Sequence, residues 1–399
     1  MQIYVVRQGD NVDEIAALFG IPVERLTWDN QIEPPYPLAV GQALLIREEA
    51  DLTGEMSETI GGVGNYGPYF PLDTGGYAYP YIDEKILTET LPYLTELQVF
   101  SYGFTEEGNL ILPQEDVNQM IKAALSWGTR PMLVLTPLGE DGHFNNALIS
   151  QLVNNTDIQQ KLIRELWEEL QDKQYGGVDL DFEYILAKDR VGYAAFVMRV
   201  RKTLNFYGYK VTVALAPKTS KSQKGLLYEA MDYKLLGKAA NQVLLMTYEW
   251  GYTYGPPMAI APIDQVRRVV EYAVTEIPKE KINLGIPNYG YDWPLPYQRG
   301  TTKAQSIGSK EAVRIAIMNG AKIQFDATSQ SPYFYYWKYG IQHVVWFEDV
   351  RSIAAKFELV KEFKLNGVGY WQIMTLFRAN WLLAESEFLI QKQVITEKL

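Results

Sequence analysis

The sequence predicts an α/β protein in which a (β/α)8 TIM barrel follows a small βααβ unit. Short β-rich runs alternate with amphipathic helical stretches between residues 74 and 390, and eight such runs can be counted. This alternation is typical of parallel strands joined by crossover helices, and eight units in about 320 residues fit a closed barrel. A strand–helix–helix–strand pattern within the first 48 residues predicts a separate small domain before it.

The N-terminal unit is expected at residues 1–48. A short strand is predicted at 3–6, and Asp10 or Asn11 can cap the helix that follows it. Gly20 ends that helix, Pro22 begins a second one, and a closing strand is expected at 43–46. Residues 49–73, which are acidic and then rich in Gly and Pro, are interpreted as a linker and barrel entry.

The barrel domain is expected at residues 74–390. Its strands are predicted at 76–82, 97–104, 132–137, 177–184, 211–217, 243–250, 282–289 and 367–373, with clear helices at 157–170, 193–204 and 263–277. The long connection after the seventh strand predicts a small α+β insertion at about 295–350. An open doubly wound sheet is the weaker alternative, because no Gly-rich phosphate loop follows the first strand.

Composition excludes several kinds of chemistry. The net charge of −11 argues against a nucleic-acid partner, and no apolar run is long enough to span a membrane. Cys is absent and only His143 and His343 occur, so thiolate zinc sites, His-rich metal sites and thiol nucleophiles are excluded. The first residues lack the pattern of a secretory signal. We therefore expect carboxylates, tyrosines and tryptophans to carry the chemistry, with no cofactor and no metal.

The fourth predicted strand carries three alternating carboxylates, Asp179, Asp181 and Glu183. Side chains alternate between the faces of a strand, so all three face one side while apolar neighbours face the other. In a barrel the apolar set faces the helices, and the carboxylates point inward near the carboxyl end, where barrel active sites lie. Burial and repulsion between like charges raise the pKa of at least one carboxyl, which suits a general acid.

The strand has two other interpretations. A solvated edge strand conflicts with the apolar alternate face. A divalent-metal site requires further ligands at other strand ends, and Glu249 and Asp292 are the candidates for that role.

Two parts of the chain resemble known families. Residues 4–11, Tyr-Val-Val-Arg-Gln-Gly-Asp-Asn, together with Asn30 and the Val-Gly-Gln at 40–42, closely resemble a LysM module, which implies binding of glycans that contain N-acetylglucosamine. The stretch 176–183 resembles the glycoside hydrolase family 18 signature Asp-Gly-x-Asp-x-Asp-x-Glu, which ends the fourth barrel strand. Gly176 replaces the leading Asp of that signature, a departure expected to affect strand support rather than catalysis.

The second resemblance implies roles for individual residues. This family is substrate-assisted: Glu183 is implied as the acid and base, Asp181 as the partner of the substrate's acetamide, and Asp179 as the group that tunes Asp181. Met246 and Tyr248 resemble the family's Met-x-Tyr-Asp motif, in which Tyr248 is implied to hydrogen-bond the acetamide. Further expected substrate contacts are Glu249, which replaces the Asp of that motif, Trp371 beneath the sugar, and Tyr102, Asn288 and Tyr289 at strand ends.

Longer runs, at 246–252, 255–259, 285–293 and 345–349, resemble the LysM-linked branch of this family in spore-forming bacteria. The branch usually carries two LysM copies, and one is visible here. The resemblance implies an N-acetylglucosaminidase acting on spore cortex fragments, spore-associated or in the mother-cell cytoplasm. It also implies glycan binding at both LysM and barrel, with no obligate protein partner. A chitinase and a non-catalytic glycan-binding protein are the alternatives, and the presence of Glu183 argues against the second.

Overall fold

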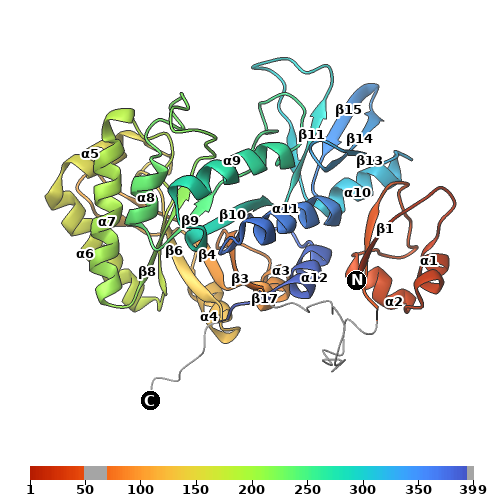
Figure 1. Cartoon of the computed structure of the whole chain (residues 1–399), viewed down its shortest axis with the longest axis horizontal. Coiled ribbons are helices and arrows are strands. Elements are labelled where there is room, and N and C mark those ends of the chain that lie inside the picture. The colour runs from red at the N-terminus through yellow and green to blue at the C-terminus, as the bar shows by residue number, and fades with distance from the viewer. Residues whose placement is uncertain (49–69, 393–399) are drawn as a thin grey trace.

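The computed structural model describes residues 1–48 and 70–392 of the chain. It confirms a small βααβ domain followed by a (β/α)8 barrel (Figure 1). The predicted linker lies almost entirely outside the described residues. Across the part of the chain that is described, no helix is both long and apolar enough to cross a membrane.

The N-terminal domain consists of two antiparallel strands and two helices. These are β1 (Gln2–Val5), α1 (Val12–Phe19), α2 (Val23–Asp29) and β2 (Ala43–Ile46). The side chain of Asn11 accepts a hydrogen bond from the Glu14 N–H at 2.9 Å, so Asn11 is the residue that caps α1. Gly20 ends that helix at φ 64°, a left-handed conformation in which glycine has no steric penalty.

Eight strands pair in parallel and close the barrel, because β16 pairs with both β10 and β3. In barrel order they are β3 (Pro71–Ala78), β4 (Glu96–Phe104), β6 (Arg130–Leu135), β7 (Gly177–Leu180), β8 (Lys210–Leu215), β9 (Gln242–Leu245), β10 (Ile282–Pro287) and β16 (Gly367–Trp371). The short β5 (Leu110–Ile111) pairs with β4, and β17 (Leu389–Ile390) pairs with β3.

Helices surround the barrel and bury its outer apolar side chains in one large core. They are α3 (Glu84–Thr90), α4 (Asn118–Ser126), α5 (Ala147–Asn154), α6 (Thr156–Asp172), α7 (Arg190–Phe206), α8 (Tyr233–Ala239), α9 (Ile263–Glu276), α11 (Val350–Phe363) and α12 (Arg378–Glu387). A much smaller apolar cluster fills the inside of the barrel, formed by Tyr77, Phe100, Val134 and Leu244.

The first, fourth and sixth strands differ most from their predicted extents. The sixth, β9, ends at Leu245 rather than Trp250. β3 begins at Pro71 rather than Gly76, because Gly75 and Gly76 are strand residues packed against Gln98 and Ile373, not turn residues. β7 ends at Leu180 rather than Tyr184. The N–H of Asp181 still donates to Leu135 O at 3.0 Å, but the chain then leaves the sheet. The residues that follow Leu180 are therefore held by loop contacts rather than by the strand.

The insertion after the seventh barrel strand is confirmed as a small α+β unit. It contains an antiparallel sheet of β11 (Gly290–Pro294), β12 (Gln305–Ile307), β13 (Gln324–Asp326), β14 (Ser331–Lys338) and β15 (Ile341–Trp346), with α10 (Ser309–Met318). It begins with β11, slightly before the predicted start near residue 295. Its own apolar cluster includes Ala39 of the N-terminal domain.

The N-terminal domain packs beside α10 and α12, on the opposite side of the molecule from α5 to α8 (Figure 1). Arg378 at the start of α12 donates to Trp28 O at 2.7 Å and lies 4.1 Å from the centre of the Trp28 ring. The N–H of Ile323 donates to Val40 O at 2.9 Å. Backbone and side-chain contacts therefore fix the small domain against both the barrel and the insertion.

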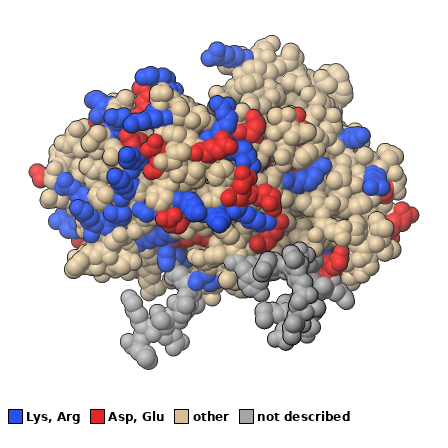
Figure 2. Space-filling model, in the orientation of Figure 1, with Lys and Arg blue, Asp and Glu red and all other residues tan. Residues whose placement is uncertain are grey.

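Charged side chains are unevenly distributed over the surface. On the face drawn in Figure 2, Lys and Arg gather over the half that contains α5 to α8 in Figure 1. Helix α7 alone carries four basic and no acidic side chains, Arg190, Arg199, Arg201 and Lys202. The negative net charge of the chain therefore coexists with a locally basic surface.

Candidate active site

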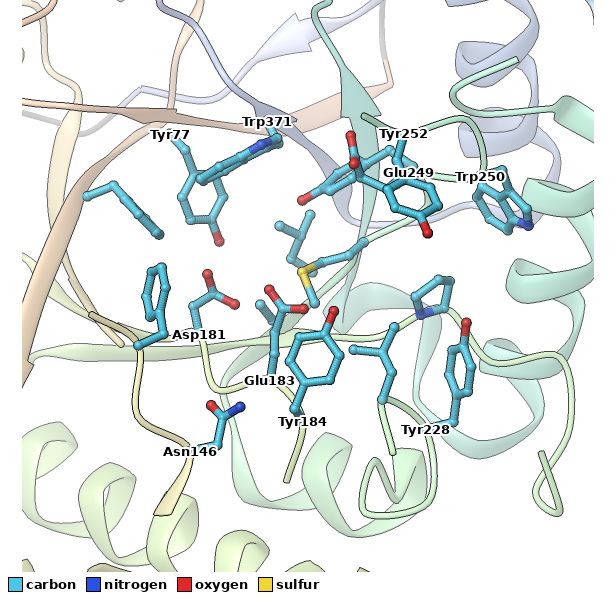
Figure 3. Close-up of a pocket in the computed structure, with 18 of the residues that line it drawn as sticks. Tyr77, Asn146, Asp181, Glu183, Tyr184, Tyr228, Glu249, Trp250, Tyr252 and Trp371 are labelled. Atoms are coloured by element: carbon cyan, nitrogen blue, oxygen red, sulfur yellow. The ribbon is translucent and has the colours of Figure 1, made fainter. Parts of the chain in front are cut away.

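A cavity of about 870 Å³ opens at the carboxyl ends of the barrel strands (Figure 3). Carboxylates and aromatic rings line most of it. The lining includes Tyr77, Phe100, Asn146, Asp181, Glu183, Tyr184, Tyr228, Met246, Tyr248, Glu249, Trp250, Tyr252, Gln265, Arg268 and Trp371. This is the position at which barrel enzymes bind their substrates.

The three carboxylates lie at different depths: Asp179 is in β7, and Asp181 and Glu183 follow it. Asp179 lies beneath the cavity, only 1% exposed, and accepts hydrogen bonds from the Tyr77 hydroxyl at 2.7 Å and the Thr212 hydroxyl at 2.5 Å. Asp181 and Glu183 line the cavity above it. Alternation along the strand thus puts the three side chains on one side, although Glu183 lies beyond the last paired residue.

Asp181 and Glu183 are held in an environment that favours their protonated forms. Burial raises the pKa of Asp181 well above its usual value, and the charges of Glu183 and Asp179 raise it further. Burial also raises the pKa of Glu183, with a second contribution from the charge of Glu249. Among the described residues, Oδ1 of Asp181 is buried and has no hydrogen-bond partner. A donor group of a ligand in the cavity can supply that partner.

The chain after β9 supplies a second group of polar side chains. Tyr248 and Glu249 both line the cavity, and Glu249 adopts φ 64°, a left-handed conformation that is uncommon outside glycine. Glu249 accepts hydrogen bonds from the hydroxyls of Tyr289 and Tyr291. Burial and the nearby charges of Asp181 and Glu183 raise the pKa of Tyr248, so its hydroxyl remains a donor.

Trp371 forms an aromatic wall together with Tyr77 and Phe100. Trp371 is the last residue of β16, and its ring meets those of Tyr77 and Phe100 edge-on, with centroids 5.6 and 5.0 Å away. Figure 3 shows the Trp371 and Tyr77 rings on one side of the cavity, close to Asp181. Apolar ring surface next to a carboxylate suits a sugar ring that carries a polar substituent.

Three residues predicted as substrate contacts do not line the cavity. Tyr102 is fully buried on the outer side of β4, where its hydroxyl bonds Glu169 and Tyr175, each at 3.0 Å. Tyr102 was expected in the site because it lies near the end of its strand, but the register of β4 shifts between Val99 and Tyr102 and changes the direction of the side chains there.

Asn288 and Tyr289 also lie outside the lining of the cavity. The side-chain amide of Asn288 donates to the carbonyl oxygens of Gln372 and Thr375, at 3.2 and 2.8 Å, and so ties the end of β10 to the chain after β16. The Tyr289 hydroxyl donates a hydrogen bond to Oε1 of Glu249, so Tyr289 positions that carboxylate but does not line the cavity itself.

Several residues in or beneath the cavity were missed in the sequence. Tyr77 falls inside the first predicted strand, where alternation with Tyr79 indicated a shared face. Thr212 is a polar residue in an otherwise apolar strand, a signal of an inward hydrogen bond. The lining also includes Asn146, Tyr184, Tyr228, Trp250, Tyr252, Gln265 and Arg268, which lie on loops or on α9, where side-chain periodicity gives no signal of a shared site.

Gly176 lies at the opposite end of β7 from Glu183. A Cβ atom there would stand 2.3 Å from Cγ of Arg130, so the Arg130 side chain occupies the space of the missing one. Arg130 donates to Glu96 at 3.1 Å. The absent Asp therefore changes contacts at the base of the barrel, away from the cavity.

The metal interpretation had Glu249 and Asp292 as its candidate further ligands, and of these only Glu249 lines the cavity. Asp292 lies in β11 and bonds the Tyr336 hydroxyl at 2.6 Å and Nδ1 of His343 at 2.8 Å, and it does not line the cavity. Within residues 1–48 and 70–392, no group of three or more His, Cys, Asp and Glu side chains is arranged to hold a metal ion.

Comparison with family models gives two matches. Residues 97–375 match glycosyl hydrolases family 18, and residues 4–47 match the LysM domain. The first match includes seven of the eight barrel strands, counting β4 from its second residue, together with the insertion and the carboxylates Asp179, Asp181 and Glu183.

Similar proteins align over nearly the whole chain. A cortical fragment-lytic enzyme of Bacillus subtilis is 36% identical, over 98% of this chain and 99% of its own length. The crystal structure of the spore cortex-lytic enzyme SleL of Bacillus cereus superposes with a TM-score of 0.90 at 34% identity, covering 98% of both chains. The SleL of Bacillus megaterium gives the same TM-score and identity, covering 98% of this chain and 99% of that one.

Proposed function

The chain belongs to the family 18 glycosyl hydrolases, and from that premise we propose that it hydrolyses β-1,4 bonds at N-acetylglucosamine in spore cortex fragments. Its LysM and family 18 domains indicate binding of glycans that contain N-acetylglucosamine. The proposal for the cortex rests on the relatives named cortical fragment-lytic enzymes, which align over nearly the full chain.

We infer a retaining, substrate-assisted reaction. Glu183 donates its proton to the glycosidic oxygen as the bond from that oxygen to the anomeric carbon breaks. The acetamido oxygen of the same sugar attacks the anomeric carbon, and a cyclic oxazolinium ion forms. Glu183, now a carboxylate, removes a proton from a water molecule that attacks the anomeric carbon from the side the leaving group left. The ring reopens, and the configuration is retained.

The single observation that carries this mechanism is Oδ1 of Asp181, which lies at the cavity beside Glu183 and has no hydrogen-bond partner within the described part of the chain. An acetamide N–H donates to such an oxygen. The positive charge that develops on the oxazolinium ion favours the ionised form of Asp181, which offsets that charge. Asp179 tunes Asp181 from below, and the Tyr248 hydroxyl bonds the acetamide oxygen. Trp371 supports the sugar ring. Met246 and Glu249 contact substrate farther along the cavity.

The domains divide this function between them. We propose residues 1–48 as a LysM domain that holds the glycan, 49–73 as linker and barrel entry, and 74–390 as the catalytic domain. Spore association follows from the relatives, which are spore cortex-lytic enzymes, and we propose the coat, the cortex or the mother-cell cytoplasm as its place. A chitinase with the same catalytic residues is the second candidate.

Substrate assistance can be tested by weakening the acetamide as a nucleophile. In an aryl N-acetylglucosaminide series with zero to three fluorine atoms on the acetyl group, we expect kcat to fall steeply with each fluorine, because the carbonyl oxygen loses electron density. A flat series would contradict the mechanism.

The substrate can be tested by incubating the protein with cortex fragments and identifying the new reducing ends by mass spectrometry. We expect these ends to be N-acetylglucosamine. Ends in muramic acid, or activity on chitin oligomers alone, would contradict the cortex proposal.

A further inference from the structure

Among the described residues that line the cavity, Arg268 on α9 carries the one cationic side chain. The other charged residues of the lining are Asp181, Glu183 and Glu249, all acidic. An anionic group on a bound glycan is therefore repelled near the carboxylates and attracted toward Arg268. The lining therefore combines three acidic side chains with a single basic one.

Arg268 belongs to α9, the helix that follows the loop after β9. The N–H of Trp250 in that loop donates to Ile260 O at 3.1 Å, shortly before α9 begins at Ile263. In Figure 3, Trp250 and Tyr228 lie across the cavity from Asp181, with Glu183 between them. A chain of sugars that has one ring at Asp181 can therefore extend past Glu183 within the same cavity, whose lining includes both Trp250 and Arg268.

The guanidinium of Arg268 retains most of its donors for a ligand. Its Nη1 donates to Oε1 of Gln265 at 3.3 Å, and within the described chain it forms no ion pair. Its neighbour Arg267 differs in every respect: it does not line the cavity and is bound by Glu362 through two hydrogen bonds of 2.7 Å. A guanidinium has five N–H donors, so Arg268 can bind a carboxylate through two of them while Gln265 holds it in place.

We propose that Arg268 forms a carboxylate-recognising subsite that selects N-acetylated glycans bearing a carboxylate over neutral ones. Chitin has no charged substituent, whereas the muramic acid of peptidoglycan carries a lactyl group that ends in a carboxylate or in a peptide with carboxylates. Binding at Arg268 thus favours peptidoglycan over chitin, although the same catalytic residues can act on both. This inference rests on the proposed hydrolysis and deepens it by naming the substrate feature that is recognised.

The experiment compares one oligosaccharide preparation in two states. Peptidoglycan oligosaccharides are used with free carboxylates and after amidation of those carboxylates, and kcat/KM of the full chain is measured for both. For the wild type we expect a preference for the free carboxylates that weakens as salt is added, because the contact is partly exposed. Arg268→Gln should lower the ratio of the two kcat/KM values about tenfold, chiefly through KM.

Two variants complete the test. Arg268→Lys keeps the charge without the planar pair of donors, so an intermediate ratio is expected. Arg267→Gln, one residue away and outside the cavity, should leave the wild-type ratio. A wild-type enzyme that cleaves both preparations equally, or an Arg268→Gln variant with the wild-type ratio, would overturn the subsite alone. Failure to cleave either preparation would instead contradict the proposed function.

Discussion

The two ends of the barrel bury the same kind of residue in opposite ways. At the amino end, Glu96 accepts hydrogen bonds from Lys210 at 2.7 Å and Arg130 at 3.1 Å. Asp73 beside it lies 3.4 Å from the same Lys210 nitrogen and accepts from the Asn283 amide at 3.1 Å. At the carboxyl end, Asp181 and Glu183 form no ion pair within the described chain, and their charged neighbours beneath and beside them are carboxylates.

The carboxylates at the amino end of the barrel contribute to stability, whereas those at the carboxyl end are arranged for chemistry. Burial raises the pKa of Glu96 as well, but the charge of Lys210 opposes the shift. Burial and like charges both raise the pKa of Asp181. A buried carboxylate with a cation strengthens the folded state relative to one left without it, whereas unpaired buried carboxylates are costly. The uncompensated group lies at the end of the barrel where barrel enzymes carry out catalysis.

The largest effect is expected for Glu183→Gln at the carboxyl end. The glutamine cannot donate a proton to the leaving oxygen, so we expect kcat on N-acetylglucosamine glycans to fall by about 10³-fold. The free energy of unfolding at pH 7 should not fall, because a charge next to Asp181 has been removed. Reducing-end release and urea unfolding measure the two quantities. A variant as active as wild type would contradict the role of Glu183.

The next effect is expected for Asp181→Asn. Loss of the charge beside the oxazolinium ion should lower kcat about 100-fold. The folded-state pKa of Asp181 is raised, so the folded protein binds more protons than the unfolded chain, and stability falls as pH rises from about 4 through that raised pKa. We expect the variant to flatten this fall, measured as urea unfolding at several pH values. An unchanged slope would contradict the assigned environment.

Lys210→Met tests the amino end. It leaves Glu96 and Asp73 without their shared cation, and we expect the free energy of unfolding to drop by about 2–3 kcal/mol, because a partly screened buried pair is broken. Lys202→Met on the exposed face of α7 is the matched control, with an expected change within about 0.5 kcal/mol. If both variants lost the same small amount of unfolding free energy, the stabilising role of Lys210 at the amino end would be contradicted.

The smallest effect is expected for Glu249→Gln. The charge of Glu249 contributes to the raised pKa of Glu183, so its removal lowers that pKa. Since Glu183 must be protonated to act as the acid, the alkaline limb of the kcat/KM profile should move toward lower pH, by less than about one unit. The amide oxygen of the glutamine can still accept from Tyr289 and Tyr291. A limb that moves toward higher pH would contradict the electrostatic argument.

The sequence by itself determined the elements whose pattern is local. Eight apolar runs in order, a βααβ unit and the alternation of Asp179, Asp181 and Glu183 are written in side-chain periodicity, which the backbone must follow when one face is buried. The position of these carboxylates on the fourth of eight strands followed from counting. Tyr248 and Trp371 were also identified from the sequence, because short motifs near predicted strand ends resemble those of the family.

Only the tertiary structure decided which side chains meet across the barrel. A shift in the register of β4 turned Tyr102 outward, and Tyr289 and Asn288 support neighbouring segments instead of lining the cavity. The Lys210 and Glu96 pair and the Tyr77 and Asp179 bond each join residues about 100 positions apart in the chain. Such contacts depend on strand register, barrel closure and loop paths, which no local periodicity specifies.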